Sequence, residues 1–176
     1  MIIDLREILQ EQGLSATHRQ TIADPYVALE DLPPGFDAPI HVQATVQNTG
    51  SSVLATVSLE TQVTMPCSRC LTPVTMPIRV KYVEEYVPAG DNEGLSPEEA
   101  GVAGVYQDQQ LDLSAGIREN LLLALPMKPL CRPDCAGLCP QCGQNLNDGT
   151  CSCETAPAVD PRLAQLQRLL EGEGNS

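Results

Sequence analysis

The cysteines of this chain constrain its fold more than any other feature. Six of them lie between residues 131 and 153, in the stretch CRPDCAGLCPQCGQNLNDGTCSC, and two more form a Cys-x-x-Cys pair at 67 and 70. Eight cysteines in 176 residues fall below the density of small disulfide-stabilised domains. The first residues, MIIDLREILQEQG, carry charges that a secretory signal would not tolerate. We therefore expect a cytoplasmic, soluble protein with reduced, metal-binding thiols.

The pair Cys67 and Cys70 lies between two segments of alternating hydrophobicity, which places it at the tip of a β-hairpin. Redox-active Cys-x-x-Cys pairs instead begin a helix, whose N-terminus lowers the pKa of the nucleophilic thiol. A tight turn that presents two thiolates is the usual half of a structural zinc site, and a closed tetrahedral site needs four ligands. The pair therefore requires two partners from elsewhere in the chain.

The six distal cysteines supply these partners and a second site. The segment CPQCG at 139–143 is typical of a zinc knuckle, in which glycine relieves the turn and backbone amides point at the sulfurs. A turn at 147–149 folds the last two cysteines back. We predict two structural zinc ions in tetrathiolate sites, one held by Cys67, Cys70, Cys131 and Cys135, the other by Cys139, Cys142, Cys151 and Cys153. A competing partition joins the cysteines at 131, 135, 139 and 142, and leaves 67 and 70 with 151 and 153.

Hydrophobic periodicity predicts an α+β fold with an antiparallel β-sheet body. A short strand at 1–4 and a helical turn come first, and we interpret 14–37 as loop because prolines and glycine punctuate it. Period-two alternation then predicts three successive antiparallel strands. Their apolar positions fall at 40–46, 53–65 and 74–82, with a turn at 48–50 between the first two.

In the second half of the chain we expect irregular segments between short strands and helices. An acidic excursion at 88–104 precedes a strand at 105–113. Ser114 is expected to cap a helix over 114–125, which packs Ile117, Leu121 and Leu125 on the sheet. A further short helix is expected at 160–170.

These patterns predict three regions. Residues 1–130 form the β-rich body with its helix at 114–125. Residues 131–155 form a Cys-rich, zinc-ribbon-like segment that docks on the hairpin tip at 67–70. Residues 156–176 form a short helix and tail.

The charge balance is strongly acidic, because 23 acidic and 10 basic residues give a net charge of -13. Such a surface repels phosphate backbones at long range, so we do not expect naked nucleic acid to be the primary ligand. A basic protein partner is favoured instead. No apolar run approaches the roughly 18 residues that cross a bilayer, so no membrane partner is expected.

Other polar residues give weaker signals, and none is predicted to be catalytic. His41 falls on the polar side of a strand, so we interpret it, like His18, as solvated. The neighbours Glu84 and Glu85 would point to opposite faces of a strand and share a metal ion poorly. Arg69 and Arg132 adjoin predicted ligands, and they either cover sulfur charge or contact a partner.

Four stretches of the chain carry a wider resemblance. They are CSRCLTPV at 67–74, LLLALPMKPLC at 121–131, DCAGLCPQCGQNLNDGTCSC at 134–153 and DPRLAQLQRLL at 160–170. Together they resemble the YceD family, over most of the chain from about residue 38. The resemblance implies a role in accumulation of large-subunit (23S) ribosomal RNA, with the eight cysteines as metal ligands and no established catalytic residue.

The resemblance and the charge together suggest a function. We expect a non-enzymatic ribosome-biogenesis factor that binds a basic ribosomal protein or a large-subunit precursor. One alternative is an rRNA-processing enzyme that uses Glu84 and Glu85 with magnesium. Another is a thiol redox or zinc sensor that uses Cys67 and Cys70, with labile metal and reversible oxidation.

Overall fold

A computed structural model describes residues 1–29, 31–90 and 101–153. The chain divides into two compact units, Met1–Cys135 and Ala136–Ser176. The helices and strands among the described residues all belong to the first unit. In chain order they are β1 (Ile2–Asp4), the 3-10 helix η1 (Ile8–Gln10), β2 (Ser15–Ile22), α1 (Pro25–Ala28), β3 (Ile40–Asn48), β4 (Val53–Pro66), β5 (Pro73–Pro88), β6 (Gly104–Tyr106), β7 (Gln110–Asp112) and α2 (Ser114–Leu123).

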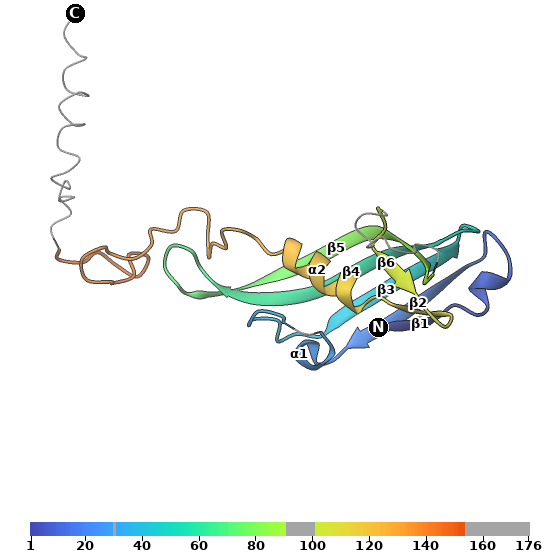
Figure 1. Cartoon of the computed structure of the whole chain (residues 1–176). Helices are drawn as coiled ribbons and strands as arrows, with labels where there is room; N and C mark the ends of the chain where they lie inside the picture. Colours follow the sequence, from blue (N-terminus) through green and yellow to red (C-terminus); the bar gives the residue numbers. More distant parts are fainter. Residues whose placement is uncertain (30, 91–100, 154–176) are drawn as a thin grey trace, which may run out of the picture. The chain divides into compact units, whose positions relative to one another are not determined.

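A five-stranded sheet in the order β2-β3-β4-β5-β6 dominates the first unit (Figure 1). Neighbouring strands from β2 to β5 are antiparallel, and β6 pairs with β5 in parallel. A separate two-stranded sheet pairs β1 with β7. The first unit therefore has the predicted α+β architecture, with an antiparallel body.

The three strands predicted from alternating hydrophobicity are present, and their apolar positions face the core. β3 buries its even-numbered side chains, and β4 buries its odd-numbered ones. The register places Val42 opposite Leu59 and Ala44 opposite Val57, so the buried residues of the two strands share one face. This inner face, together with residues of β1, β7 and α2, forms the hydrophobic core.

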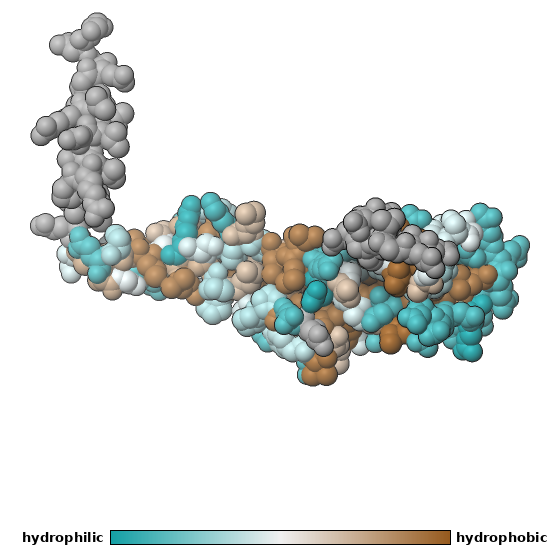
Figure 2. All heavy atoms as spheres, viewed as in Figure 1, coloured by the Kyte–Doolittle hydropathy of each residue, from teal (hydrophilic) through white to brown (hydrophobic). Residues whose placement is uncertain are grey.

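Helix α2 covers the inner face through Ile117 and Leu121, which are fully buried. The helix ends at Leu123, two residues earlier than expected. The prediction that Ser114 caps it was wrong, because Leu113 is the N-cap residue and no side chain caps the helix. Instead Asp112 accepts hydrogen bonds from the backbone N–H and the hydroxyl of Ser114. Figure 2 shows hydrophobic surface beside this helix, where Leu123 is exposed.

The interpretation of residues 14–37 as loop was wrong, because β2 pairs with β3 along eight positions. The inward positions of β2 are Ala16, His18, Gln20 and Ile22, opposite the buried residues of β3. Only Ile22 among them is a large aliphatic residue, so the sequence lacks the period-two signal. Pairing of the backbone with β3 therefore specifies this strand more than its own side chains do.

The single strand predicted at 105–113 was also wrong, because a tight turn divides it into β6 and β7. The turn residues Asp108 and Gln109 both have positive φ, of 51° and 60°. Two successive residues in this region define a type I′ turn, which usually contains glycine. Because neither residue is glycine, the reversal is hard to predict from the sequence.

Two sequence predictions concern residues outside the described part of the chain. These are the short helix at 160–170 and most of the acidic excursion at 88–104. Among the described residues, none of the helices is long and apolar enough to span a bilayer.

The loop before β3 is held against β4 at Gly35. Its backbone carbonyl accepts a hydrogen bond from the Thr64 amide, at 2.9 Å. The Tyr26 hydroxyl accepts hydrogen bonds from the amides of Gly35 and Phe36, and the Phe36 ring is fully buried. A Cβ atom at Gly35 would lie 2.2 Å from the Thr64 carbonyl oxygen, and its φ is +114°.

Replacing Gly35 with alanine should therefore lower the free energy of unfolding by at least about 2 kcal/mol, through the clash and the left-handed backbone together. Gly13→Ala is the matched control, because Gly13 also has positive φ but has open space around it. It should cost only about 1 kcal/mol. Urea denaturation of both variants measures the difference, and equal losses would contradict the close approach of this loop to β4.

Candidate metal centre

The turn between β4 and β5 presents Cys67 and Cys70 at the hairpin tip, as predicted. The Cys67 amide donates to the Thr72 carbonyl, and the Leu71 amide donates to the Cys67 carbonyl. Leu71 has a φ of 61°, so the chain reverses there without glycine. Both cysteines are buried. No described helix begins at this pair, which lacks the helix N-terminus that redox-active pairs use.

Cys131 and Cys135 meet this pair and form the first tetrad. The Sγ atoms of Cys67 and Cys135 are 3.8 Å apart, and those of Cys70 and Cys131 are 3.6 Å apart. All four sulfur atoms lie within 4.8 Å of one another. The first tetrad therefore joins residues more than sixty positions apart in the sequence, all of them within the first unit.

The second tetrad lies within the second unit and consists of Cys139, Cys142, Cys151 and Cys153. Their sulfur atoms also lie within 4.8 Å of one another. The knuckle is closed by the Gly143 amide, which donates to the Cys139 carbonyl, and by the Cys139 amide, which donates to the Gln144 carbonyl. Gly143 has a φ of 74°, the left-handed conformation that glycine adopts readily. The structure thus groups the cysteines as the favoured partition predicts and not as the competing one does.

Backbone amides point at one sulfur of each knuckle. Hydrogen bonds from the amides of Arg69 and Cys70 lower the pKa of Cys67 to about 6. Hydrogen bonds from the amides of Cys142 and Gln141 lower the pKa of Cys139 to about 6 in the same way. Each tetrad therefore contains one thiol that the backbone favours in its ionised form.

Another thiol in each tetrad resists ionisation. Desolvation and the neighbouring Cys135 thiol raise the pKa of Cys131 to about 12. The Cys142 thiol and desolvation raise the pKa of Cys153 to about 12. Four thiolates this close repel one another, so a bound cation is needed to ionise all of them.

The dimensions of the tetrads fit a tetrahedral metal ion. Zinc–sulfur bonds of about 2.3 Å give a tetrahedron whose sulfur–sulfur edges are about 3.8 Å long. In the first tetrad, the Cys70–Cys131 and Cys67–Cys135 sulfur–sulfur distances of 3.6 and 3.8 Å match this edge. A disulfide would need sulfur atoms about 2 Å apart, and none of the eight cysteines is in a disulfide. Both tetrads are therefore compatible with metal binding.

The structure also shows the surroundings of Glu84, Glu85, His18 and His41. Glu84 accepts hydrogen bonds from the Tyr86 hydroxyl and the Asn120 amide, whereas Glu85 accepts one from the Ser52 hydroxyl. These partners confirm that the two carboxylates point to opposite faces of β5. His41 is exposed, as predicted, whereas His18 is half-buried.

The two arginines beside the first tetrad make local contacts. The Arg69 guanidinium donates a hydrogen bond to the Cys135 carbonyl, at 2.8 Å, and Arg132 forms an ion pair with Asp134. The Arg69 side chain therefore links the hairpin tip to the segment that carries Cys131 and Cys135. From the sequence we predict only that Arg69 covers sulfur charge or contacts a partner.

Two further residues support the first tetrad and were missed from the sequence. The Thr72 hydroxyl lies 3.3 Å from Cys70 Sγ and lowers the pKa of that thiol. The buried Pro129 accepts a hydrogen bond from the Ser68 amide through its carbonyl, at 2.8 Å. A hydroxyl residue two positions after Cys-x-x-Cys is a signal that could have identified Thr72.

Comparisons with known proteins identify the family of the chain. The family model described as large ribosomal RNA subunit accumulation protein YceD matches residues 55–170. The uncharacterized protein Rv2926c of Mycobacterium tuberculosis strain H37Rv is 29% identical over 177 residues, which cover 100% of this chain and 84% of the relative. YlbN of Bacillus subtilis, also named as uncharacterized, is 24% identical over 140 residues, covering 79% of this chain and 78% of its own.

A plant relative carries a functional name. The Zea mays protein named large ribosomal RNA subunit accumulation protein YCED homolog 1, chloroplastic, is 36% identical over 64 residues, which cover 36% of this chain and 22% of the maize protein. No solved structure matches the chain. The family match begins in β4 and includes every cysteine of both tetrads, and the chain therefore belongs to the YceD family.

Proposed function

We propose that the chain is a non-enzymatic ribosome-biogenesis factor that supports the accumulation of large-subunit ribosomal RNA. The family match over residues 55–170 carries this proposal, because that family is described as a large ribosomal RNA subunit accumulation protein. The factor acts by binding a basic ribosomal protein or an assembly intermediate. Its net charge of -13 favours a cationic partner.

The two tetrads hold one structural zinc ion each. Reduced thiolates in a tetrahedral arrangement select zinc among the common divalent ions. A site closed by four thiolates keeps no open position for a water molecule or a substrate, so zinc here supports structure and not hydrolysis. In the first tetrad the zinc ion links the hairpin tip to the segment at 131–135. In the second tetrad it links the knuckle at 139–143 to Cys151 and Cys153.

Substitution of one thiol in each tetrad tests the metal assignment. Cys70→Ser and Cys142→Ser should each reduce the zinc content of the purified protein from about two ions to about one. Because a structural zinc ion contributes about 10 to 16 kcal/mol of apparent binding energy in peptides, Cys70→Ser should also lower the melting temperature of the first unit. Elemental analysis and thermal unfolding measure the two effects.

Ser68→Ala is the matched control for the first tetrad. Ser68 lies in the same turn, but its known contact is made by its backbone amide. This variant should keep both ions and the parent melting temperature. The zinc assignment is wrong if the parent protein, purified from reducing cells, is fully folded and free of metal. If either cysteine variant loses both ions, the two sites are not independent.

Affinity purification of the tagged protein tests the partner. Lysates are bound at about 50 mM and about 200 mM salt, with and without ribonuclease, because contacts between charged surfaces weaken as salt screens them. We expect ribosomal proteins or large-subunit precursors to be retained at low salt and lost at high salt. Retention of a ribosomal protein after ribonuclease treatment identifies a direct protein contact.

A tagged, unrelated protein of similar negative charge shows how much binding is nonspecific. If it retains the same ribosomal proteins to the same extent, the proposed partner is wrong. Cleavage of precursor rRNA by the purified protein, abolished by Glu84→Gln, would replace the proposal with an enzymatic function.

A further inference from the structure

The face of the sheet opposite α2 carries eight polar residues in two rows across β2, β3, β4 and β5. The first row consists of the cross-strand neighbours Arg19, Gln43, Ser58 and Lys81. The second row consists of Thr21, His41, Glu60 and Arg79. We call these eight residues the open face. Seven of them are exposed, and Ser58 is half-buried.

The charge of the open face is opposite to that of the whole chain. Its three cations, Arg19, Arg79 and Lys81, face a single carboxylate, Glu60, whereas the chain has a net charge of -13. Arg79 and Glu60 approach to 3.8 Å, and both side chains are largely exposed. Because exposed pairs of this kind contribute little energy, the Arg79 guanidinium remains available to a ligand.

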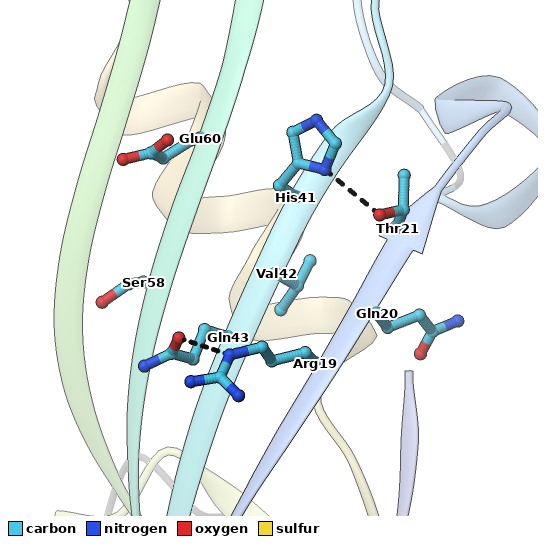
Figure 3. A pocket seen from close by; sticks show the side chains of 8 residues that line it. All are labelled: Arg19, Gln20, Thr21, His41, Val42, Gln43, Ser58 and Glu60. Atoms are coloured by element: carbon cyan, nitrogen blue, oxygen red, sulfur yellow. Dashed lines mark hydrogen bonds between the residues drawn. The ribbon is translucent and has the colours of Figure 1, made fainter.

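Six of the eight residues of the open face, all except Arg79 and Lys81, line a shallow depression. Its volume is about 450 Å³, and its lining includes Arg19, His41 and Ser58. Arg19 Nε donates a hydrogen bond to Gln43 Oε1, at 2.9 Å, and the Thr21 hydroxyl lies 3.1 Å from His41 Nδ1 (Figure 3). These cross-strand contacts limit the rotamers of the long side chains, which lowers the entropic cost of binding.

The composition of the two rows suits a sugar–phosphate backbone better than a protein surface. Arginine and lysine bind phosphate oxygens, and hydroxyl, amide and imidazole groups bind phosphates and sugars. Protein interfaces instead depend on buried aromatic and aliphatic anchors. The residues of the two rows include none of these. Arg19 and Lys81 lie at opposite ends of the first row, about 14 Å apart across three strand spacings.

We propose that the open face binds the phosphate backbone of an RNA strand. The proposal rests on the proposed function, since ribosome assembly supplies the RNA, and it adds a second contact to the protein partner inferred there. The negative charge of the rest of the chain opposes approach of free RNA, so the contact is weak at physiological salt. It becomes effective once the protein partner holds the factor on the precursor and raises the local RNA concentration.

Fluorescence anisotropy with a labelled polyuridine strand tests the proposal on the full-length, zinc-loaded protein. At about 50 mM salt, Arg19→Gln and Lys81→Gln should each weaken binding about threefold, and each should reduce the salt slope by about 0.7. Glu60→Gln should have the opposite effect and strengthen binding about threefold, because it removes the only carboxylate of the two rows. Circular dichroism shows whether each variant keeps its fold.

Arg6→Gln is the matched control, because it makes the same change in net charge at a residue outside the two rows. Arg6 pairs with Asp4 at the end of β1. If it weakens binding as much as Arg19→Gln, net charge alone explains the effect and the proposal fails. It also fails if Glu60→Gln weakens binding, if no binding occurs at low salt, or if a polyglutamate peptide binds as tightly as the RNA.

The outcomes separate this proposal from the proposed function. If the open-face variants do not affect RNA binding but the protein still co-purifies with ribosomal precursors, the function stands without this surface. If the open face binds RNA as described but no precursor or ribosomal protein co-purifies from cells, the surface stands and the proposed function fails.

Discussion

The pairing of β4 with β5 is the constraint on which the rest of this structure depends. The two strands pair from Val53 with Tyr86 at one end to Pro66 with Pro73 at the other, so backbone hydrogen bonds fix the turn at 67–72 at the hairpin tip (Figure 1). A shift of one residue would turn every side chain to the other face of the sheet. One register therefore positions much of the core, the first two thiols and two of the three cations of the open face.

The local charge of each surface explains the contacts of this protein better than the net charge of the whole chain does. Net charge governs long-range attraction and repulsion, but a ligand in contact responds to the groups within about 10 Å, the Debye length at moderate salt. The open face has three cations and one carboxylate, although acidic residues outnumber basic ones more than twofold in the chain. The proposed binding of a cationic protein and the proposed contact with RNA are compatible, because they would use different surfaces.

The sequence was most informative where side chains alone determine the structure. Strands β3, β4 and β5 could be predicted because valine, isoleucine and leucine alternate along them, and the thiol grouping could be predicted from the knuckle spacing. β2 could not, because its inward positions include Ala16, His18 and Gln20, and its place depends on backbone pairing with β3. Since Arg19 joins the open face only through β2, the loop interpretation also hid that surface.

The chain between α2 and Cys135 shows why the thiols carry a structural role. It contains no helix or strand, and most of residues 131–135 are exposed. Its contacts with the hairpin tip include those of the Pro129 carbonyl, the Cys131 amide, the Cys135 carbonyl and the thiols. Hydrogen bonds of this kind contribute about 1 kcal/mol each, which is close to the conformational entropy lost per ordered residue. These bonds alone offset little of that loss, so the zinc ion proposed for the first tetrad would supply much of the energy that holds the segment at the hairpin tip.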